Sequence, residues 1–230
     1  MALLAVKTQG DLGTDLVLAP ERYDPRRESL NGARDAVLLG EIATVVRRTV
    51  SPSKNGGSRC LVLDTSDVRE GLVVGQKGLV DGSEIGSAKK VAEPGEVIVS
   101  RLRPYLRQVG FVDAGILNYG AGVQLAFSTE FYVLRSMSGA SIAFLVPLLL
   151  SEPVQQVLAA SQEGGHHPRF NESVLLDLPV PRRLLEQRAE VSRQVERAVE
   201  EYRRSEEGIG KAIKTANECF SKKRGCRSVE

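Results

Sequence analysis

The sequence contains few of the residues that covalent catalysis and metal binding require. Its 230 residues include no tryptophan, two histidines and three cysteines. Cys60, Cys219 and Cys226 are odd in number and lack the spacing of zinc ligands, so they predict neither a disulfide framework nor a zinc site. His166 and His167 are adjacent and would point apart on a strand or a helix, which is typical of polar loop residues, with a nucleic-acid contact as the alternative. We expect reduced thiols in a cytoplasmic protein, with no metal and no cofactor.

Long apolar runs are also missing. A helix that crosses a bilayer takes about 20 apolar residues, whereas the longest run here, residues 142–150, contains Pro147. Residues 1–5 have neither the basic nor the apolar region of a signal peptide, so we expect none. Apolar residues nevertheless make up 42% of the chain, which is enough for a sizeable core. The length suits one domain, or one domain with an appendage.

Several motifs of enzymes that act on nucleotides or DNA are absent. There is no phosphate-binding G-x-x-x-x-G-K-[ST] loop, and residues 208–211 only resemble a fragment of one. No G-x-G-x-x-G follows a strand-like run, and the N-P-P-[YF] motif of amino-methyltransferases does not occur. No lysine has Asp or Glu two positions earlier, which argues against the nucleases that hold a metal with such a pair. We therefore expect a protein that is not an enzyme.

Neither sign of charge is in large excess, since the net charge is +2. The charge is uneven, however. Residues 181–230 carry 13 Lys and Arg against 9 Asp and Glu, whereas residues 1–180 carry 18 against 20. The chain is therefore no polycation of the histone kind. Any contact between its first 180 residues and DNA must come from a local basic patch.

What the sequence does contain, from residue 37 to residue 177, is a series of short apolar runs bounded by Gly, Pro, Asp and Ser, which predict strands. Clear examples are residues 60–63, 97–100, 108–112 and 131–134, and residues 16–19 predict a further short strand. One helical stretch, residues 141–162, interrupts them. Its second half opens at Ser151-Glu152-Pro153, and Gly164-Gly165 ends it.

A long helix is predicted after the stiff segment Pro179-Val180-Pro181. Residues 184–220 contain no proline and repeat apolar residues at spacings of three and four. About 37 helical residues would extend roughly 55 Å, which is longer than the rest of the chain can cover. Part of the apolar stripe should therefore meet another helix, from this chain or from a partner. The stripe consists of Val191, Val195, Ala198, Tyr202, Ile209, Ala212 and Ala216.

Three stretches of the sequence, in order, resemble the specificity subunits of type I restriction-modification systems. The first is residues 95–106, which contain a strand-like run followed by Ser100-Arg101 and Pro104. The second is residues 131–135, followed by the helical stretch through residue 155. The third runs from Gly164-Gly165 through Pro168-Arg169-Phe170 and Leu178-Pro179-Val180-Pro181 to Glu186-Gln187, and leads into the long helix. Together they span roughly residues 35–222.

The resemblance implies a non-catalytic subunit that contributes DNA recognition. Members of that family place loops of a target-recognition domain in the DNA grooves, while partner methyltransferase subunits bind S-adenosylmethionine and flip the target base. They carry two recognition domains, each followed by a long helix, and the two helices pack antiparallel. This sequence has room for one of each, so the resemblance implies a half-subunit form that pairs with a second copy through the helical arm. The alternative is an adaptor that assembles a defence complex through its arm without reading DNA.

We predict an α+β fold with four parts: an N-terminal segment of unknown role (1–32), a β-rich target-recognition domain (33–180), a long helical arm (181–222) and a basic tail (223–230). The densest arginine group of the domain is expected to contact double-stranded DNA, since arginine can fork onto guanine or phosphate. The alternative is a solvated strand end whose arginines pair with Glu96 or Asp113. An adaptor would instead show an apolar patch at this place. The candidate DNA-binding residues are Arg101, Arg103, Tyr105 and Arg107, then Lys54, Asn55 and Arg59 of a polar loop, and Lys89, Lys90 and Arg169 as phosphate contacts.

Overall fold

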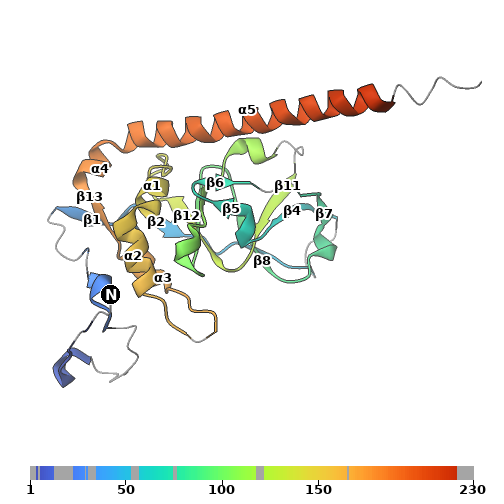
Figure 1. Ribbon diagram of the computed structural model, residues 1–230. Coiled ribbons are helices and arrows are strands. Elements are labelled where there is room, and N and C mark those ends of the chain that lie inside the picture. The colour runs from blue at the N-terminus through green and yellow to red at the C-terminus, as the bar shows by residue number, and fades with distance from the viewer. Residues whose placement is uncertain are drawn as a thin grey trace, which may run out of the picture.

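The computed structural model describes residues 4, 6–12, 23–28, 30, 35–52, 57–74, 77–117, 122–164 and 166–221. Two sheets and several short helices form a body, residues 35–181, and one long helix follows it (Figure 1). This confirms the predicted α+β fold, with a β-rich part followed by a helical arm. The strand expected at residues 16–19 and the tail at residues 223–230 lie outside the described residues.

The body contains two larger sheets and two strand pairs. The first sheet is antiparallel, with the spatial order β10 (Val109–Phe111), β9 (Val97–Ser100), β12 (Phe131–Ser136) and β2 (Ala43–Val45). The second has the order β3 (Thr49–Val50), β8 (Lys89–Ala92), β11 (Val123–Phe127), β4 (Arg59–Leu63) and β7 (Val80–Asp81), with β11 and β4 parallel. The pairs are β5 (Val68–Arg69) with β6 (Leu72–Val73), and β1 (Ala36–Leu38) with β13 (Pro179–Pro181). The four clearest predicted strands are confirmed as β4, β9, β10 and β12, to within two residues at each end.

Alternating side chains of the first sheet serve two cores. Val99 and Tyr132 face the helices α1 (Leu145–Leu150) and α2 (Glu152–Ala160), whereas Ile98 and Val133 share a cluster with residues of the second sheet. Successive side chains of a strand point to opposite faces, so the near-continuous apolar runs of β9 and β12 are those of strands covered on both sides. The four-stranded sheet is thus the middle layer of the body.

The single helical stretch predicted at residues 141–162 is wrong in one respect, because it forms two helices. Ser151 lies between them with an extended backbone, φ −64° and ψ 145°. Pro153 in the first turn of α2 has no N–H, and its ring would clash with the carbonyl of Leu149 in a continuous helix. The freed Leu149 carbonyl instead accepts a hydrogen bond from the Gln155 side chain at 2.6 Å.

Strand β1 pairs with β13, so the two ends of the body are joined just before the arm begins. Prolines at both ends of β13 can donate no ladder hydrogen bond, which suits a two-stranded sheet. The remaining α-helices are α3 (Glu172–Leu176), α4 (Arg182–Glu186) and α5 (Arg188–Ser221). Short 3-10 helices lie at Gln9–Leu12, Pro25–Glu28, Leu39–Glu41, Thr65–Asp67, Gly82–Glu84, Pro104–Leu106 and Ala114–Leu117.

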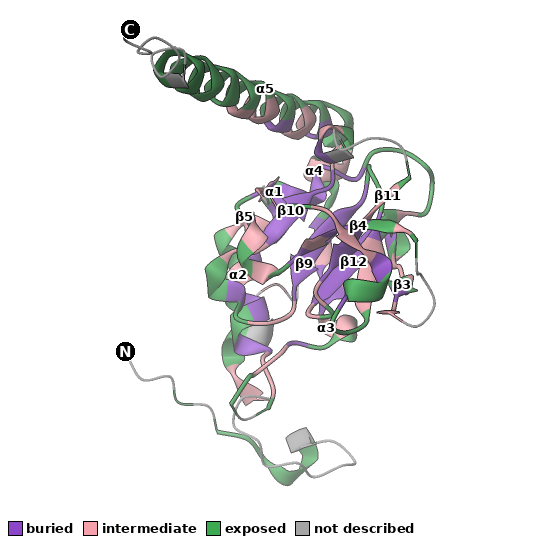
Figure 2. Ribbon diagram, turned by 90° about the vertical axis from the view of Figure 1, so that its right-hand side faces the viewer, coloured by how far each residue is buried: buried purple, intermediate pink, exposed green. Residues whose placement is uncertain are grey.

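The predicted long helix is confirmed as α5, which we call the arm. Its 34 residues extend about 51 Å. The first half lies along the body, where Val191, Val195 and Val199 pack against the core. From residue 207 to residue 220 every side chain is exposed (Figure 2). We call residues 207–221 the distal arm.

The structure therefore divides the predicted apolar stripe. Its proximal members Val191, Val195 and Tyr202 are partly covered, the two valines by the body's core, whereas Ala198 is exposed beside the buried Val199. Part of the stripe is expected to meet another helix. The body's core already packs against Val191 and Val195, so that expectation remains a prediction for the distal part of the stripe. Its distal members, Ile209, Ala212 and Ala216, are exposed.

Glu96 and Asp113, the alternative partners expected for the arginines of residues 101–107, form ion pairs with other residues. Glu96 is 3% exposed and is held by Arg48 at 2.7 Å and by Arg135 at 2.8 Å. Asp113 accepts hydrogen bonds from Arg203 of the arm, at 2.9 Å from Nη2 and 3.2 Å from Nε. The proposed pairing with Glu96 or Asp113 is therefore wrong.

Candidate nucleic-acid interface

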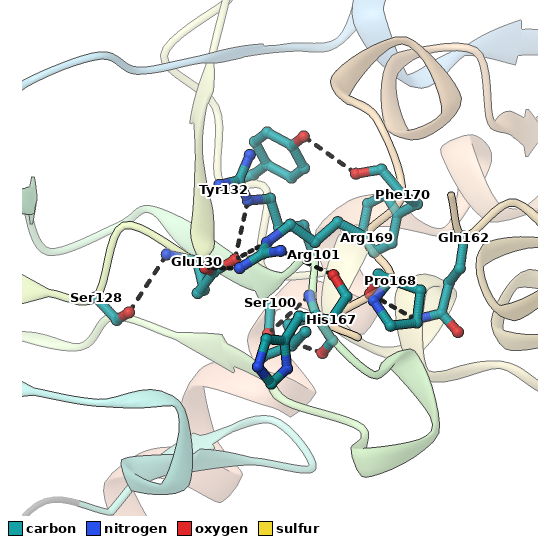
Figure 3. A network of polar contacts seen from close by, with 11 residues as sticks. Ser100, Arg101, Ser128, Glu130, Tyr132, Gln162, His167, Pro168, Arg169 and Phe170 are labelled. Carbon is teal, nitrogen blue, oxygen red and sulfur yellow. Dashed lines mark hydrogen bonds and ion pairs between the residues drawn. The ribbon is translucent and has the colours of Figure 1, made fainter. Parts of the chain in front are cut away.

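Two of the candidate arginines meet on one carboxylate. Arg101 donates from Nε to Glu130 Oε2 at 3.1 Å, and Arg169 donates from Nε to the same oxygen at 2.8 Å and from Nη2 to Oε1 at 2.6 Å (Figure 3). Beside this cluster the Tyr132 hydroxyl donates to the carbonyl oxygen of Phe170 at 3.2 Å. The cluster joins the end of β9, the turn before β12 and the segment after α2. Arg101 and Arg169 belong to the first and third stretches that resemble specificity subunits, and Glu130 directly precedes the second.

This cluster changes the role expected for Arg101 and Arg169. Their side chains are only 34% and 37% exposed, and Glu130 is 20% exposed. The hydrogen bond from Arg169 holds the pKa of Glu130 below its ordinary value, and the hydrogen bond from Arg101 acts in the same direction. Both guanidinium groups are thus engaged in holding three segments together. DNA would have to compete with Glu130 for either of them.

The segment that follows Arg101 is a tight, exposed turn, residues 103–107, which we call the basic turn. Arg103 and Arg107 both have left-handed backbones, with φ of 49° and 53°, around the 3-10 helix Pro104–Leu106. Buried Pro104 anchors the turn, while Tyr105 is 65% exposed. Two non-glycine residues in this conformation cost roughly 1–2 kcal/mol each, and strain of this kind is common at functional sites.

The arginines of the basic turn are more available than Arg101. Arg103 is exposed and makes no ion pair with any residue that the structure describes. Arg107 is 42% exposed, and its Nε lies 3.4 Å from a carboxylate oxygen of Glu70, which is itself 67% exposed. An exposed pair of this kind contributes about 0–1 kcal/mol, so a ligand can displace it at little cost.

A second loop lies beside the basic turn. An antiparallel bridge joins Leu102 to Arg169, which places the loop residues 166–168 next to this segment. His166 and His167 of that loop are exposed. The sequence predicts polar loop residues here, with a nucleic-acid contact as the alternative. The signal in favour of that alternative is their position two and three residues before Arg169.

Three further candidates, Arg59, Lys89 and Lys90, lie on the second sheet. Lys90 of β8 lies opposite Phe127 of β11, whereas Arg59 of β4 lies opposite Val123 at the other end of β11. The Lys90 ammonium lies 5.1 Å from the centre of the Tyr132 ring, close to the Arg101 cluster. The structure thus brings Lys90, Arg101 and Arg169 together and leaves Arg59 apart. Lys54 and Asn55 lie outside the described residues.

Within the described ranges, no helix is long and apolar enough to cross a membrane. In the same part of the chain, no three His, Cys, Asp or Glu side chains lie together as metal ligands would. Cys60 is a buried free thiol and Cys219 an exposed one.

Two solved structures share this fold. One belongs to a study described as "Structural basis underlying complex assembly and conformational transition of the type I R-M system", with a TM-score of 0.55 and 24% identity over 84% of this chain and 50% of that one. The other is the HsdS subunit from Thermoanaerobacter tengcongensis, with a TM-score of 0.54 and 26% identity over 82% of this chain and 47% of that one. The chain therefore spans about half the length of each. No protein-family model and no curated protein sequence matches it.

Proposed function

We propose that this chain, which has the fold of the type I specificity subunit HsdS, selects the DNA site on which partner methyltransferase subunits act. The observation that carries the proposal is the basic turn, an exposed and strained loop whose two arginines have weak partners or none. In this proposal the chain does no covalent chemistry, and the partner subunits bind S-adenosylmethionine.

The chemistry of the turn suits base recognition. Arginine forks onto O6 and N7 of guanine in the major groove, and each such pair discriminates by about 1–3 kcal/mol. Tyr105 can stack on a base or sugar, or donate its hydroxyl to a phosphate. The Arg101–Glu130–Arg169 cluster would hold the turn in place, because it fixes the segments that carry the turn and the loop residues 166–168.

We further propose that two copies of the chain pair through their distal arms, so that two recognition bodies read a two-part site. The exposed apolar side chains of the distal arm support this, since Ile209, Ile213 and Phe220 follow one another at spacings of four and seven and are 60%, 56% and 78% exposed. That is the spacing of a helix-pairing seam. An adaptor role without DNA reading is the competing function.

The test is selection of bound DNA from a randomised double-stranded library by the full chain, with and without the methyltransferase partners. We expect one sequence to be enriched. Arg103→Ala should then reduce affinity for that sequence by about 1–3 kcal/mol and relax the preference at one position. Arg204→Ala removes the same charge from an exposed site on the arm and is the matched control. No enrichment under either condition would contradict DNA recognition and favour the adaptor.

A further inference from the structure

Lys90 occupies an unusual place for a lysine. It lies on β8, is partly covered, and holds its ammonium over the Tyr132 ring rather than in open solvent. Its neighbour Lys89 points to the other face of the strand, as successive residues do, and its ammonium lies 3.3 Å from the hydroxyl of Ser87. The two lysines carry the same charge on the same strand but have different surroundings.

The carboxylates around Lys90 are already taken. Glu130 holds Arg101 and Arg169, and Glu172 holds Arg47 at 2.8 Å. Lys90 makes no ion pair with any described residue. Four cations thus share two carboxylates, which leaves an excess of two positive charges.

The electrostatic state of Lys90 agrees with this count. Burial lowers the pKa of Lys90, and the positive charges of Arg101 and Arg47 lower it further against the attraction of Glu172 and Glu130. An anion placed among these cations would relieve the repulsion. The ring of Tyr132 offers the ammonium only a cation–π contact, which is weaker than a charged partner.

We propose that Lys90, together with Arg47 and Arg101, binds one phosphate group of the DNA backbone beside the basic turn. The inference rests on the proposed function and extends it to a second kind of contact. A lysine ammonium is a compact charge that suits phosphate, and an arginine guanidinium can fork onto a phosphate as well as onto a base edge. Phosphate contacts position a protein on DNA, and base contacts specify the sequence. Lys90 is placed for the first role and the basic turn for the second.

The first measurement is DNA affinity of the full chain over a series of salt concentrations. Lys90→Gln should weaken binding to every sequence alike and reduce the slope of log affinity against log salt by about 0.9, the contribution of one phosphate. Lys214→Gln removes the same charge from an exposed site on the distal arm and should leave the slope unchanged. Thermal melting of both variants checks that they fold. Equal effects of the two substitutions would overturn the proposal, since the loss would then report overall charge.

The second measurement needs no DNA. The pKa of Lys90, followed by NMR of its ε-carbon, should rise when inorganic phosphate is added. If phosphate raises the pKa but Lys90→Gln leaves DNA affinity unchanged, these cations bind free phosphate and the DNA assignment is overturned. If the wild-type chain binds no DNA, the proposed function fails, while the response to phosphate still decides whether Lys90 and its neighbours bind an anion.

Discussion

Arg103 and Arg107 hold a backbone conformation that glycine adopts with far less strain. Arg103→Gly should therefore raise the free energy of unfolding by up to about 1 kcal/mol, because relief of left-handed strain outweighs the extra freedom of the unfolded chain. Under the proposed function the same variant loses DNA affinity. Urea unfolding and a DNA titration on one preparation check both. A less stable Arg103→Gly would mean that the arginine side chain supports the fold.

At the same scale, Glu130 links stability to pH. Its pKa lies below the ordinary value of 4.5 because Arg169 and Arg101 favour its charged form. A carboxyl of lowered pKa stabilises the fold above its unfolded-state pKa, and this contribution is lost as the pH falls through the folded-state value. Glu130→Gln should lower the free energy of unfolding by about 1–3 kcal/mol at neutral pH. Between about pH 5 and pH 3 the variant should lose less stability than the wild type, because it has no carboxyl group at this position to protonate.

Chemical denaturation across pH measures this effect. Glu84→Gln, at an exposed carboxyl that makes no ion pair with a described residue, is the control. Parallel pH curves for the wild type and Glu130→Gln would show that the cluster does not hold the three segments together.

At the scale of the element, one side chain ties the arm to the body. Arg203 is 15% exposed, and besides Asp113 it binds the carbonyl oxygen of Val73 at 2.6 Å and Glu206 at 2.9 Å. Beyond Glu206 the arm leaves the body. Gly115 belongs to the same junction, because a β-carbon there would lie 2.8 Å from Asp113 Oδ1.

Arg203→Ala should lower the free energy of unfolding by about 3–5 kcal/mol, because it leaves the carboxylate of Asp113 covered and without its partner. Arg204→Ala, next in the chain and 70% exposed, should cost about 0.3–0.5 kcal/mol. Urea unfolding measures both, and hydrogen exchange should show faster exchange in residues 199–206 for the first variant alone. Equal losses in the two variants would mean that Arg203 does not fasten the arm.

At the scale of the whole molecule, the distal arm predicts self-association. Burying a large apolar side chain stabilises by roughly 1.5–3 kcal/mol, and the distal arm exposes three. We expect sedimentation to show a dimer at tens of micromolar, an estimate based on such burial. Substitution of Ile209 and Ile213 by serine should abolish it, while Lys214→Ser leaves it intact. A monomeric wild-type chain would contradict pairing of two copies and leave a partner's helix as the occupant.

Sequence by itself determined the strands β4, β9, β10 and β12, the long helix and the three stretches of resemblance. Each of these depends on a local period or on the order of short segments. Tertiary structure alone decided which arginines are available. The partners Arg101 and Glu130 are 29 residues apart, and Asp113 and Arg203 are 90 apart. The sequence around an arginine does not show which distant carboxylate will bind it in the folded chain. For the same reason the apolar stripe of the arm could be read as one surface, although the body covers its first half and leaves the second exposed.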